Sequence, residues 1–417
     1  MTDLVNTING IVWSPVLVAM CLCIGLYFSL KLKFFQIRDV KEMFTLLLEG
    51  DSSHVGISSF QGFATSMAGR IGTGNIAGVA VAIAMGGPGA LVWMCIMATL
   101  GSATAFVEST LAQIYKDEHY GQYRGGPPYY FEKGLGWKKC SVLFSIVAII
   151  SYTFFMPGTQ SNTLYLAMNQ AFGFSKMTIA VASSIALAII IFGGIKRIGL
   201  FAEKVVPIMG GAYLIMTLVI IITNISLVPE AIVTMFKSAF GFGSVFGGML
   251  GSAISWGVKR GIYSNEAGEG SGTYGAAAAE VSHPAKQGLV QAFSVYVDTL
   301  LICMATGIMI VITGMYNVTG VCTALPGVEP GPQYVQSAIN TLHPQLGDIC
   351  IGVLTYINLI AIFTLKKPAI KAYYDYIRQK KMGIKRSDRT FNPIELDIRN
   401  AEFWENRYLK EDKHELN

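Results

Sequence analysis

Arg70-Ile-Gly-Thr-Gly-Asn-Ile-Ala-Gly78 opens onto a run, residues 71–107, that contains no Asp, Glu, Lys or Arg. A helix of about 20 residues crosses the roughly 30 Å of hydrocarbon in a bilayer, so this run is long enough for almost two crossings. Glycine weakens a helix, and an arginine within hydrocarbon costs about 2.5–3.5 kcal/mol. The stretch therefore predicts a break in a membrane-spanning helix, and a binding site at that break.

The composition around this stretch is that of a membrane protein. Of the 417 residues, 52% are hydrophobic and only 14% are charged, whereas soluble domains carry about a quarter charged residues. No long polar block is available to form a soluble domain. We therefore expect an all-α, polytopic membrane protein embedded in the lipid bilayer.

Uncharged stretches of spanning length divide the chain into nine predicted spans. They are residues 10–30, 60–85, 88–114, 142–166, 177–195, 205–226, 242–263, 289–314 and 349–365. The second and third are separated by Gly86-Gly87-Pro88-Gly89, where the proline and glycines end one helix and begin the next. The polar residues 366–417 form a predicted tail.

The basic residues of the loops predict the orientation. One side collects many Lys and Arg residues, whereas the opposite side has only Lys176 and Lys237, and none occurs in 315–348. Because cytoplasmic loops are enriched in Lys and Arg, we expect a multi-pass plasma-membrane protein with its amino terminus outside and its tail in the cytoplasm. The net charge of +5 then reflects topology and gives no indication of nucleic-acid binding.

Several other function classes are disfavoured. The seven cysteines include no Cys-x-x-Cys pair, and the five histidines lack ligand spacing, so we expect no structural or redox metal site and no cofactor. Gly72-x-Gly74-x-x-Ala77 fits a dinucleotide fingerprint, but no acidic residue follows before Glu108 to bind a ribose. No phosphate-binding loop of an ATP-driven pump and no catalytic arrangement is visible, so an enzyme is not expected.

A broken helix at Arg70–Gly78 would expose backbone groups that can bind a ligand. If the helix unwinds at Gly72 and Gly74, the amides of Thr73, Gly74 and Asn75 become free to bind a carboxylate at a helix amino terminus. The carbonyls of Ala68 and Ile71 and the Asn75 side chain offer oxygens to an alkali cation. The alternative is a seam of small residues that only packs helices together.

A second break is predicted in Gly248-Met-Leu-Gly-Ser-Ala-Ile-Ser-Trp-Gly257. Interruptions in two distant spans indicate a secondary transporter built from inverted repeats. In that interpretation Ser252, Ser255 and Trp256 form a pocket wall that faces the first break. The alternative is a packed helix followed by a glycine-rich cytoplasmic loop.

Four long motifs resemble those of the alanine or glycine:cation symporter family. They are Ile-Gly-Thr-Gly-Asn-Ile-Ala-Gly-Val (71–79), Gly-Gly-Pro-Gly-Ala-Leu-Val-Trp-Met (86–94), Trp-Gly-Val-Lys-Arg-Gly-Ile-Tyr-Ser-Asn-Glu-Ala-Gly (256–268) and His-Pro-Ala-Lys-Gln-Gly-Leu-Val-Gln (283–291). The resemblance covers residues 10–314 and resumes in 349–410. It implies uptake of alanine or glycine, with serine as a further candidate, coupled to sodium or a proton by alternating access.

The resemblance also implies an architecture, a leucine-transporter-like inverted-repeat bundle with one extra amino-terminal helix. The transmembrane domain would be 1–365, with the extra helix at 10–30, a first repeat at 60–226 and an incomplete second repeat at 242–365. The spans 60–85 and 242–263 would be the two discontinuous helices. Residues 366–417 would be the cytoplasmic tail.

Roles carried over from the family fall on particular positions. Gly72, Thr73 and Gly74 would hold the substrate carboxylate, and Gln160, in Pro157-Gly-Thr-Gln-Ser-Asn162, would contact the substrate. Gln160 and Asn162 could instead only hydrogen-bond neighbouring helices. The residues predicted to close the pocket are Ile254, Ser255 and Trp256. The predicted cation-facing positions are Ala68, Ile71 and Asn75.

Acidic residues within or near the spans are predicted to act in gating. Glu108 lies near the cytoplasmic end of its span. It has two interpretations, a gating residue or one partner in a structural ion pair with a loop cation. Asp298 lies deeper, and gating or cation coupling competes there with a structural hydrogen bond. Asn265 and Glu266, with Glu269, belong to Ser-Asn-Glu-Ala-Gly and are expected to organise the inner gate.

The chain departs from the family pattern after residue 314. The outward loop runs on to Gly347, and Asp348-Ile-Cys-Ile-Gly-Val-Leu-Thr-Tyr-Ile-Asn-Leu-Ile-Ala-Ile already resembles the family's final helix. Two spans are thus absent, and one of them is the usual source of hydroxyl ligands for the main sodium site. The alternatives are therefore a coupled amino-acid symporter, an uncoupled or non-transporting remnant of one or a regulatory subunit, and, as a different class, a membrane enzyme or channel.

Overall fold

The computed structural model describes residues 13–48, 55–242, 249–281, 283–319 and 321–327, and a few single residues farther along the chain. The chain divides into two units, Met1–Gly347 and Asp348–Asn417. The predicted span 349–365 lies outside the described residues. So does the predicted tail, apart from four positions, of which Arg378 and Glu395 form an ion pair of 3.3 Å.

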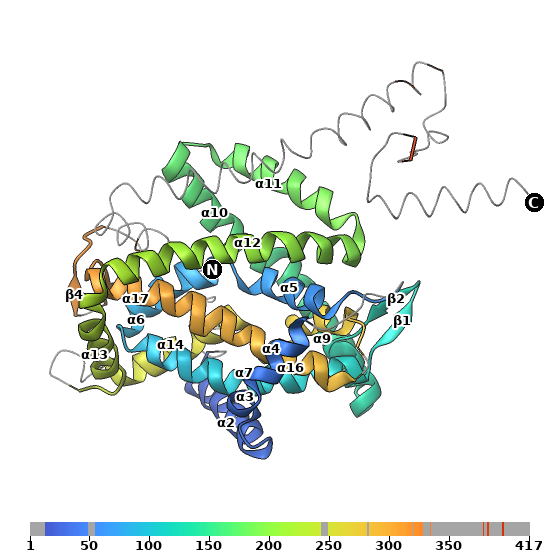
Figure 1. Ribbon diagram of the computed structural model, residues 1–417, viewed down its shortest axis with the longest axis horizontal. Helices are drawn as coiled ribbons and strands as arrows, with labels where there is room; N and C mark the ends of the chain where they lie inside the picture. Colours follow the sequence, from blue (N-terminus) through green and yellow to red (C-terminus); the bar gives the residue numbers. More distant parts are fainter. Residues whose placement is uncertain are drawn as a thin grey trace, which may run out of the picture. The chain divides into compact units, whose positions relative to one another are not determined.

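Most of the described residues of the first unit lie in helices (Figure 1). In its first part they are α2 (Pro15–Lys31), α3 (Phe35–Arg38), α4 (Val40–Leu48), α5 (Ser59–Arg70), η1 (Gly74–Gly78), α6 (Val79–Gly86), α7 (Ala90–Ile114), α8 (Pro127–Tyr129), η2 (Tyr130–Gly134), α9 (Lys138–Ile150), η3 (Ser151–Phe155) and α10 (Met156–Phe172). In its second part they are α11 (Lys176–Ile191), α12 (Gly194–Thr223), η4 (Ile225–Leu227), α13 (Val228–Ala239), α14 (Leu250–Asn265), α15 (Gly272–Ala278), α16 (Pro284–Val295), η6 (Tyr296–Cys303) and α17 (Met304–Thr313).

The strands are short and lie in loops. Strands β1 (Asp117–His119) and β2 (Gln122–Arg124) form an antiparallel hairpin, as do β3 (Asn317–Val318) and β4 (Cys322–Thr323). Tyr120 and Gly121, at the tip of the first hairpin, both have positive φ, as a two-residue hairpin turn requires. The described chain is therefore all-α in its membrane-embedded part.

Within the described residues, three helical segments are long and apolar enough to cross a bilayer: α7, α12 and the continuous run Pro284–Thr313, which joins α16, η6 and α17. The bent pair of α5 with Gly74–Gly86 would be a fourth. The predicted spans at 10–30, 142–166, 177–195 and 242–263 coincide with shorter helices, α2, α9 to α10, α11 and α14. The predicted count of nine spans stays a prediction.

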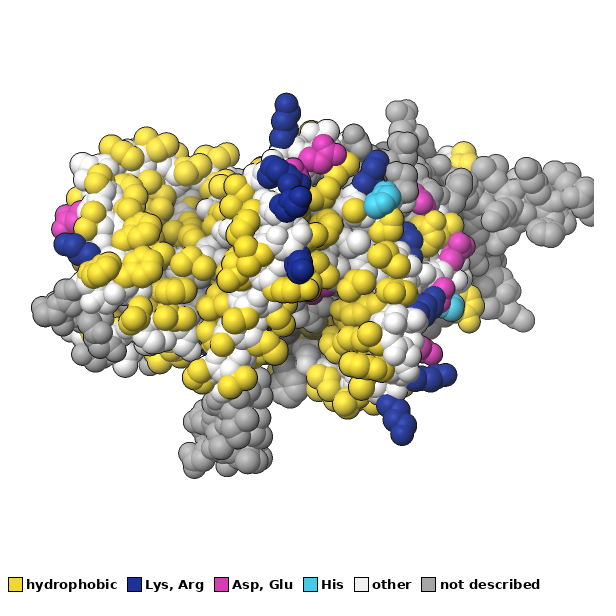
Figure 2. Space-filling model, turned by 90° about the horizontal axis from the view of Figure 1, so that it is seen from below, with side chains coloured by type: hydrophobic (Ala, Val, Ile, Leu, Met, Phe, Trp, Pro, Cys, Tyr) yellow, Lys and Arg dark blue, Asp and Glu magenta, His cyan; other side chains and the backbone are white. Residues whose placement is uncertain are grey.

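Burial separates central from peripheral helices. Of the most apolar 18-residue window of Pro284–Thr313, 67% is buried within the protein. The corresponding buried share for α12 is only 22%. Large apolar side chains of α11 and α12 are exposed, among them Ile185, Leu187, Ile208 and Ile222. Figure 2 shows a face on which apolar side chains cover most of the described surface. This is the surface expected of a protein whose solvent is lipid.

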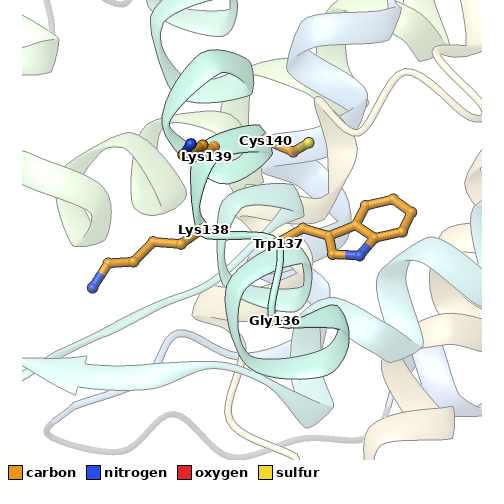
Figure 3. Close-up of a pocket in the computed structure, with 5 residues that line it drawn as sticks. All are labelled: Gly136, Trp137, Lys138, Lys139 and Cys140. Atoms are coloured by element: carbon orange, nitrogen blue, oxygen red, sulfur yellow. The ribbon is translucent and has the colours of Figure 1, made fainter.

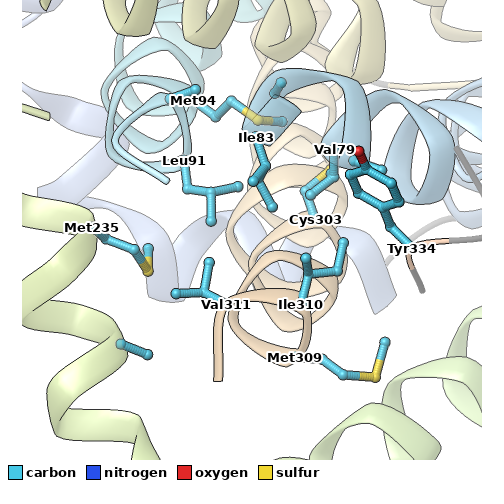
Figure 4. Close-up of a cluster of buried hydrophobic side chains, with 14 of the residues drawn as sticks. Val79, Ile83, Leu91, Met94, Met235, Cys303, Met309, Ile310, Val311 and Tyr334 are labelled. Carbon is cyan, nitrogen blue, oxygen red and sulfur yellow. The ribbon is translucent and has the colours of Figure 1, made fainter. Parts of the chain in front are cut away.

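The largest buried apolar cluster lies where α6, α7 and α17 meet (Figure 4). Ile83, Leu91, Met94 and Ile310 are all completely or almost completely buried there. Close approach of the helices needs glycine, because a Cβ on Gly307 would lie 2.6 Å from the Leu91 side chain. The cluster fixes the helices that carry the first break.

The first break is confirmed. Helix α5 ends at Arg70, Ile71 takes extended φ and ψ angles, and the helix resumes as the π-helical turn η1 before α6. The two helical parts meet at an angle of 53°. The break therefore falls on the Arg70–Gly78 stretch, where glycines make irregular backbone inexpensive.

The predicted position of the second break is wrong for the part of 248–257 that the structure describes. Helix α14 is continuous from Leu250 to Asn265. The chain leaves the helix only at Glu266, with φ of 55°, and Gly268 and Gly270 follow with φ of 91° and 86° before α15 begins. The glycine within α14 serves packing instead, since a Cβ on Gly257 would lie 2.6 Å from the carbonyl oxygen of Ala90 on α7.

Candidate functional site

The Gln160 side chain of α10 covers the amides of the first break. Its Oε1 accepts a hydrogen bond from the Thr73 backbone amide at 3.2 Å. The side-chain carboxamide of Gln160 also lies over Gly72, where a Cβ would stand 3.1 Å from Gln160 Oε1. The structure thus brings together three of the predicted substrate residues, two on the break and one on a helix that is distant in the sequence.

Asn75 links this half of the break to an acidic residue. Its Oδ1 accepts from the Gly72 amide at 2.9 Å, while its Nδ2 donates to Asp298 Oδ1 at 2.6 Å. Asn75 is 1% exposed and Asp298 is completely buried. One carboxamide therefore touches both the predicted substrate half and a carboxylate of η6.

Hydroxyl groups complete the surroundings of Asp298. Its Oδ2 accepts from Ser264 at 2.9 Å and from Thr299 at 2.8 Å. Asp298 lies in the π-helical segment η6, and π-helical turns recur at functional sites because they widen the helix. We call Asn75, Ser264, Asp298 and Thr299 the Asp298 cluster; it joins three interrupted or widened helices, at η1, the end of α14 and η6.

The cysteine Cys303 lies between the Asp298 cluster and the apolar core. Its Sγ is within 3.2 Å of Asn75 Nδ2 and 3.1 Å of Ser264 Oγ, and its other side packs in the apolar cluster of Figure 4. The polar cluster is thus closed off on this side by buried apolar groups. Electrostatic interactions inside it are stronger than they would be in water.

The other predicted gating residues lie at or beside the second break, at residues 266–271. Glu108 Oε1 accepts from the Gly268 amide at 3.2 Å, so it contacts the second break; among the described residues it forms no ion pair with a loop cation. Glu266 Oε2 accepts from Ser271 at 2.6 Å. Asn265 holds the end of α14 with its Oδ1 on the Ala267 amide and its Nδ2 toward Thr299 Oγ1 at 3.3 Å. Asn265 is therefore joined to the Asp298 cluster, while Glu108 and Glu266 lie at the break itself.

The remaining predicted residues take other positions. Ser252 Oγ donates to the Met85 carbonyl, and a Cβ on Gly86 would lie 3.1 Å from Trp256 Cβ. This part of α14, which includes Ile254 and Ser255, therefore packs along α6 and α7 instead of forming a second break. The residues of α14 that face Gly74 are Tyr263 and Ser264.

The carbonyls proposed for a cation are at the end of α5. Ala68 is in the last turn of α5, and Ile71 is the first residue outside it. The Ile71 side chain reaches α12, where a Cβ on Gly210 would lie 3.2 Å from its Cδ1. Ile71 has extended backbone angles, so its carbonyl does not follow the helical direction of α5, and its role in binding a cation stays a prediction.

Sequence reasoning missed Ser264, Thr299 and Ser294 as members of the site, and it treated Arg70 only as a flanking charge. Ser294 accepts a hydrogen bond from Arg70 Nη1, and Arg70 is 2% exposed. A signal was available: Gln287, Gln291, Ser294 and Asp298 follow at intervals of four, three and four residues, which places them on one face of a helix.

A surface hollow occurs elsewhere, at the start of α9 (Figure 3). It is lined by Gly136, Trp137, Lys138, Lys139 and Cys140, all of them exposed. None of the predicted site residues borders this hollow. Its lining has no carboxylate and no enclosed wall, so it offers little to orient a small ligand.

Comparison with known proteins identifies relatives over most of the chain. The chain is 45% identical to a protein of Bacillus subtilis (strain 168) named as a candidate sodium/proton-dependent alanine carrier, YrbD, with 99% of each chain covered. It is 40% identical to a sodium/proton-dependent alanine carrier protein of Bacillus sp. (strain PS3), with 88% of this chain and 98% of the relative covered. It is 39% identical to the sodium/alanine symporter AgcS of Methanococcus maripaludis, with 85% and 79% covered.

The alignment with YrbD bears on the departure after residue 314. It extends over 482 positions, so at least 65 of them have no counterpart among the 417 residues of this chain. That number of residues is enough for two spans with their loops.

The family itself follows from a match to most of the chain. The sequence profile described as "Sodium:alanine symporter family" matches residues 1–347. The apolar helices of the structure agree with an integral membrane protein. The chain belongs to the sodium:alanine symporter family, whose members are transporters and not enzymes.

Proposed function

We propose that this protein is a secondary active symporter that couples entry of a sodium ion or proton to uptake of alanine or a similarly small amino acid. The observation that carries the proposal is Asn75, whose Oδ1 is bonded to the Gly72 amide and whose Nδ2 is bonded to Asp298. A change at either side of this carboxamide is transmitted to the other. Relatives named as alanine carriers support the same conclusion.

The substrate carboxylate is proposed to bind at the first break. The amides of Thr73 and Gly74 lie at the start of η1, where helix amino termini favour anions. In this structure the Thr73 amide donates its hydrogen bond to Gln160 Oε1. A substrate carboxylate that binds the Thr73 amide therefore replaces Gln160 Oε1 as the acceptor. Tyr263 and Ser264 lie against Gly74 and limit the space to a small side chain such as that of alanine, glycine or serine.

The cation is proposed to bind at the Asp298 cluster. One carboxylate and two hydroxyl groups, of Asp298, Ser264 and Thr299, provide the oxygen ligands that hard cations prefer. A sodium ion or a proton would compensate the buried negative charge. This cluster uses only helices in the described part of the chain, so the predicted absence of two spans does not remove it.

Alternating access is proposed to use both breaks within a leucine-transporter-like fold. The first repeat would be 60–226 and the shortened second repeat 242–365, with the discontinuous helices α5–η1–α6 and α14–α15. The two breaks are joined by contacts, because Asn75 of the first donates toward Ser264 near the end of α14 at 3.2 Å. Short irregular segments at such positions give helices the freedom to tilt.

The test is uptake of labelled alanine and glycine into vesicles that contain the purified protein, with and without an inward sodium gradient. We expect gradient-driven accumulation of alanine. Asp298→Asn keeps the shape of the side chain but removes its charge, and we expect it to abolish the response to sodium. Uptake that is equal with and without gradients of sodium and protons would contradict the coupling.

A second candidate is an uncoupled or non-transporting remnant of such a symporter. It is favoured by the gap of at least 65 positions in the alignment with YrbD and by the end of the family match at residue 347. The matching experiment inserts the corresponding segment of YrbD between Gly347 and Asp348. Uptake that appears only after the insertion would establish the remnant.

A further inference from the structure

A stripe of polar side chains runs along one face of the central helix α16–η6. Gln287, Gln291, Ser294 and Asp298 are each completely buried, although the helix is apolar enough to span a membrane. Their spacing of four, three and four residues places them one above the other. Ionisable residues within a span, here Asp298 and the facing Arg70, mark ion or proton pathways.

Helix α5 contacts this stripe at two places. A Cβ on Gly62 would lie 2.8 Å from Gln287 Nε2, and Gln291 Nε2 donates to the Gly62 carbonyl at 3.3 Å. Two turns farther, Arg70 Nη1 donates to Ser294, whereas Ser66, on the turn between, donates to the Gly272 carbonyl at the start of α15. We call this contact between α5 and α16–η6, from Gln287 to Asp298, the polar seam.

The polar seam contains groups whose hydrogen-bonding capacity is unused. Among the described residues, neither Gln287 Oε1 nor Nε2 has a partner, and Nε and Nη2 of Arg70 also lack one. Buried polar atoms are almost always paired with protein or water, and a buried water binds where several such atoms converge. These unused donors and acceptors indicate that the seam accommodates water or a polar ligand.

The polar seam has two distinct ends. One end is the Asp298 cluster at the first break. The other is the start of α16, where Ile57 forms a bridge with Ala278 and Glu280 through backbone bonds of 3.0 and 2.8 Å. This second end carries Lys286 and belongs to the side that the basic loops predict to be cytoplasmic.

Arg70 lies between these ends and acts on carboxylates at both breaks. It interacts electrostatically with Asp298 on one side and with Glu108, Glu266 and Glu269 on the other. Among the described residues none of these carboxylates is within ion-pair distance of Arg70. The Glu266 carboxylate is nevertheless close to the neighbouring backbone, since its Oε1 would lie 3.4 Å from a Cβ on Gly69. Arg70 thus has alternative anionic partners that it does not contact in this conformation.

We propose that the polar seam is the route by which the coupling cation leaves the Asp298 cluster toward the cytoplasm, and that Arg70 is its electrostatic gate. While Arg70 is bonded to Ser294, its positive charge stands in the seam and repels a cation, as arginines do in selective pores. A tilt of α5 that moves Arg70 toward Glu266 opens the seam. This inference rests on the proposed function, because it assumes that a cation binds at Asp298.

The experiment measures entry of labelled sodium into protein-containing vesicles in the absence of any amino acid. We expect the unmodified protein and Arg70→Lys, which keeps the charge, to show little entry. Arg70→Gln removes the barrier, so we expect sodium entry to rise about tenfold or more, the change expected for loss of one nearby charge. Lys116→Gln, which removes a partly buried cation outside the seam, should not raise it.

A second variant tests the route itself. Gln287→Leu has a similar volume and places an apolar group across the seam, so we expect the Arg70→Gln/Gln287→Leu protein to lose most of the sodium entry seen in Arg70→Gln. Ser294→Ala removes the hydrogen-bond partner of Arg70 but keeps its charge, and provides a milder opening if Arg70→Gln does not fold; we expect a smaller rise in entry there.

The outcomes separate this inference from the proposed function. Sodium-coupled alanine uptake in the unmodified protein, together with no rise in sodium entry in folded Arg70→Gln, would overturn the gate and leave the symport intact. A sodium leak that Gln287→Leu does not reduce would overturn the route. A leak controlled by Arg70 in a protein with no alanine uptake would support the gate and contradict the symport alone.

Discussion

At the scale of single residues, one asparagine joins the two halves of the site. Asn75 uses its oxygen for the Gly72 amide and its nitrogen for Asp298. Because both groups are buried, loss of the side chain would leave a carboxylate and an amide with fewer partners, at about 1–3 kcal/mol for each unsatisfied group. In the proposed function, this shared asparagine is the contact through which a carboxylate bound at the break and a cation bound at Asp298 influence each other.

A first prediction concerns the space beside Gly74. A Cβ at this position would be in ordinary contact with Ser264 Cα at 3.4 Å and Tyr263 Cδ1 at 3.6 Å, so the γ carbons of Gly74→Val must enter the space proposed for the carboxylate. We expect alanine affinity to fall at least about tenfold, or about 1.4 kcal/mol. Isothermal titration of purified protein with alanine measures it.

The control for this substitution is Gly211→Val. A Cβ on Gly211 of α12 meets nothing within 4 Å, so valine is tolerated there apart from its slightly lower helix propensity. Unchanged alanine affinity in Gly74→Val, with Gly211→Val also unchanged, would remove the first break from the substrate site.

At the scale of elements, glycine has two different uses in helix α14 and in the break that follows it. Gly268 and Gly270 have positive φ in the second break, a conformation that costs other residues energy. Gly257 lies within the continuous helix α14 and allows α7 to approach. The residue type is glycine in both cases. Only the position of the neighbouring helix shows which glycine allows close packing and which one interrupts the helix.

A second prediction follows for the contact between α14 and α7. Gly257→Ala places a methyl group 2.5 Å from Trp93 Cβ and 2.6 Å from the Ala90 carbonyl oxygen. The backbones must separate, and we expect a loss of stability of about 1–3 kcal/mol. Thermal unfolding of the purified protein in detergent measures it.

Gly251→Ala is the matched control on the same helix. A Cβ on Gly251 meets nothing within 4 Å, so alanine there is expected to stabilise the helix by about 1 kcal/mol or less. If Gly257→Ala were as stable as Gly251→Ala, α14 and α7 would not be in the close contact described here.

At the scale of the whole molecule, the predicted topology and the predicted absence of two spans agree with each other. The family match and the first structural unit both end at residue 347, the place at which two spans are predicted to be absent. Loss of an even number of spans keeps the tail on its original side of the membrane. The distribution of basic residues is therefore compatible with the shortened chain.

The topology gives a third prediction, which uses two turns. The tip of the β1–β2 hairpin, Tyr120–Gly121, is predicted to be cytoplasmic, and the turn at Gly173 between α10 and α11 is predicted to be outside. Tyr120 is 96% exposed, so a short protease site inserted there is accessible. We expect cleavage at Tyr120 only in inside-out vesicles and cleavage at Gly173 only in intact cells; the reverse pattern would invert the orientation.

The sequence by itself determined the membrane class and the first break at Arg70–Gly78, because each depends on local composition; the approach of Gln160 to the break was only implied by the family resemblance, and the structure shows it. The tertiary structure decided where the second break lies, because glycines that pack helices and glycines that interrupt them look alike in a sequence. It also decided that Asn75, Ser264, Asp298 and Thr299 meet, and that Arg70 stands against Ser294. The contacts of Asn75 with Ser264 and Asp298, and of Arg70 with Ser294, join residues about 190 to 225 positions apart, and only the packing of helices around one buried charge brings them together.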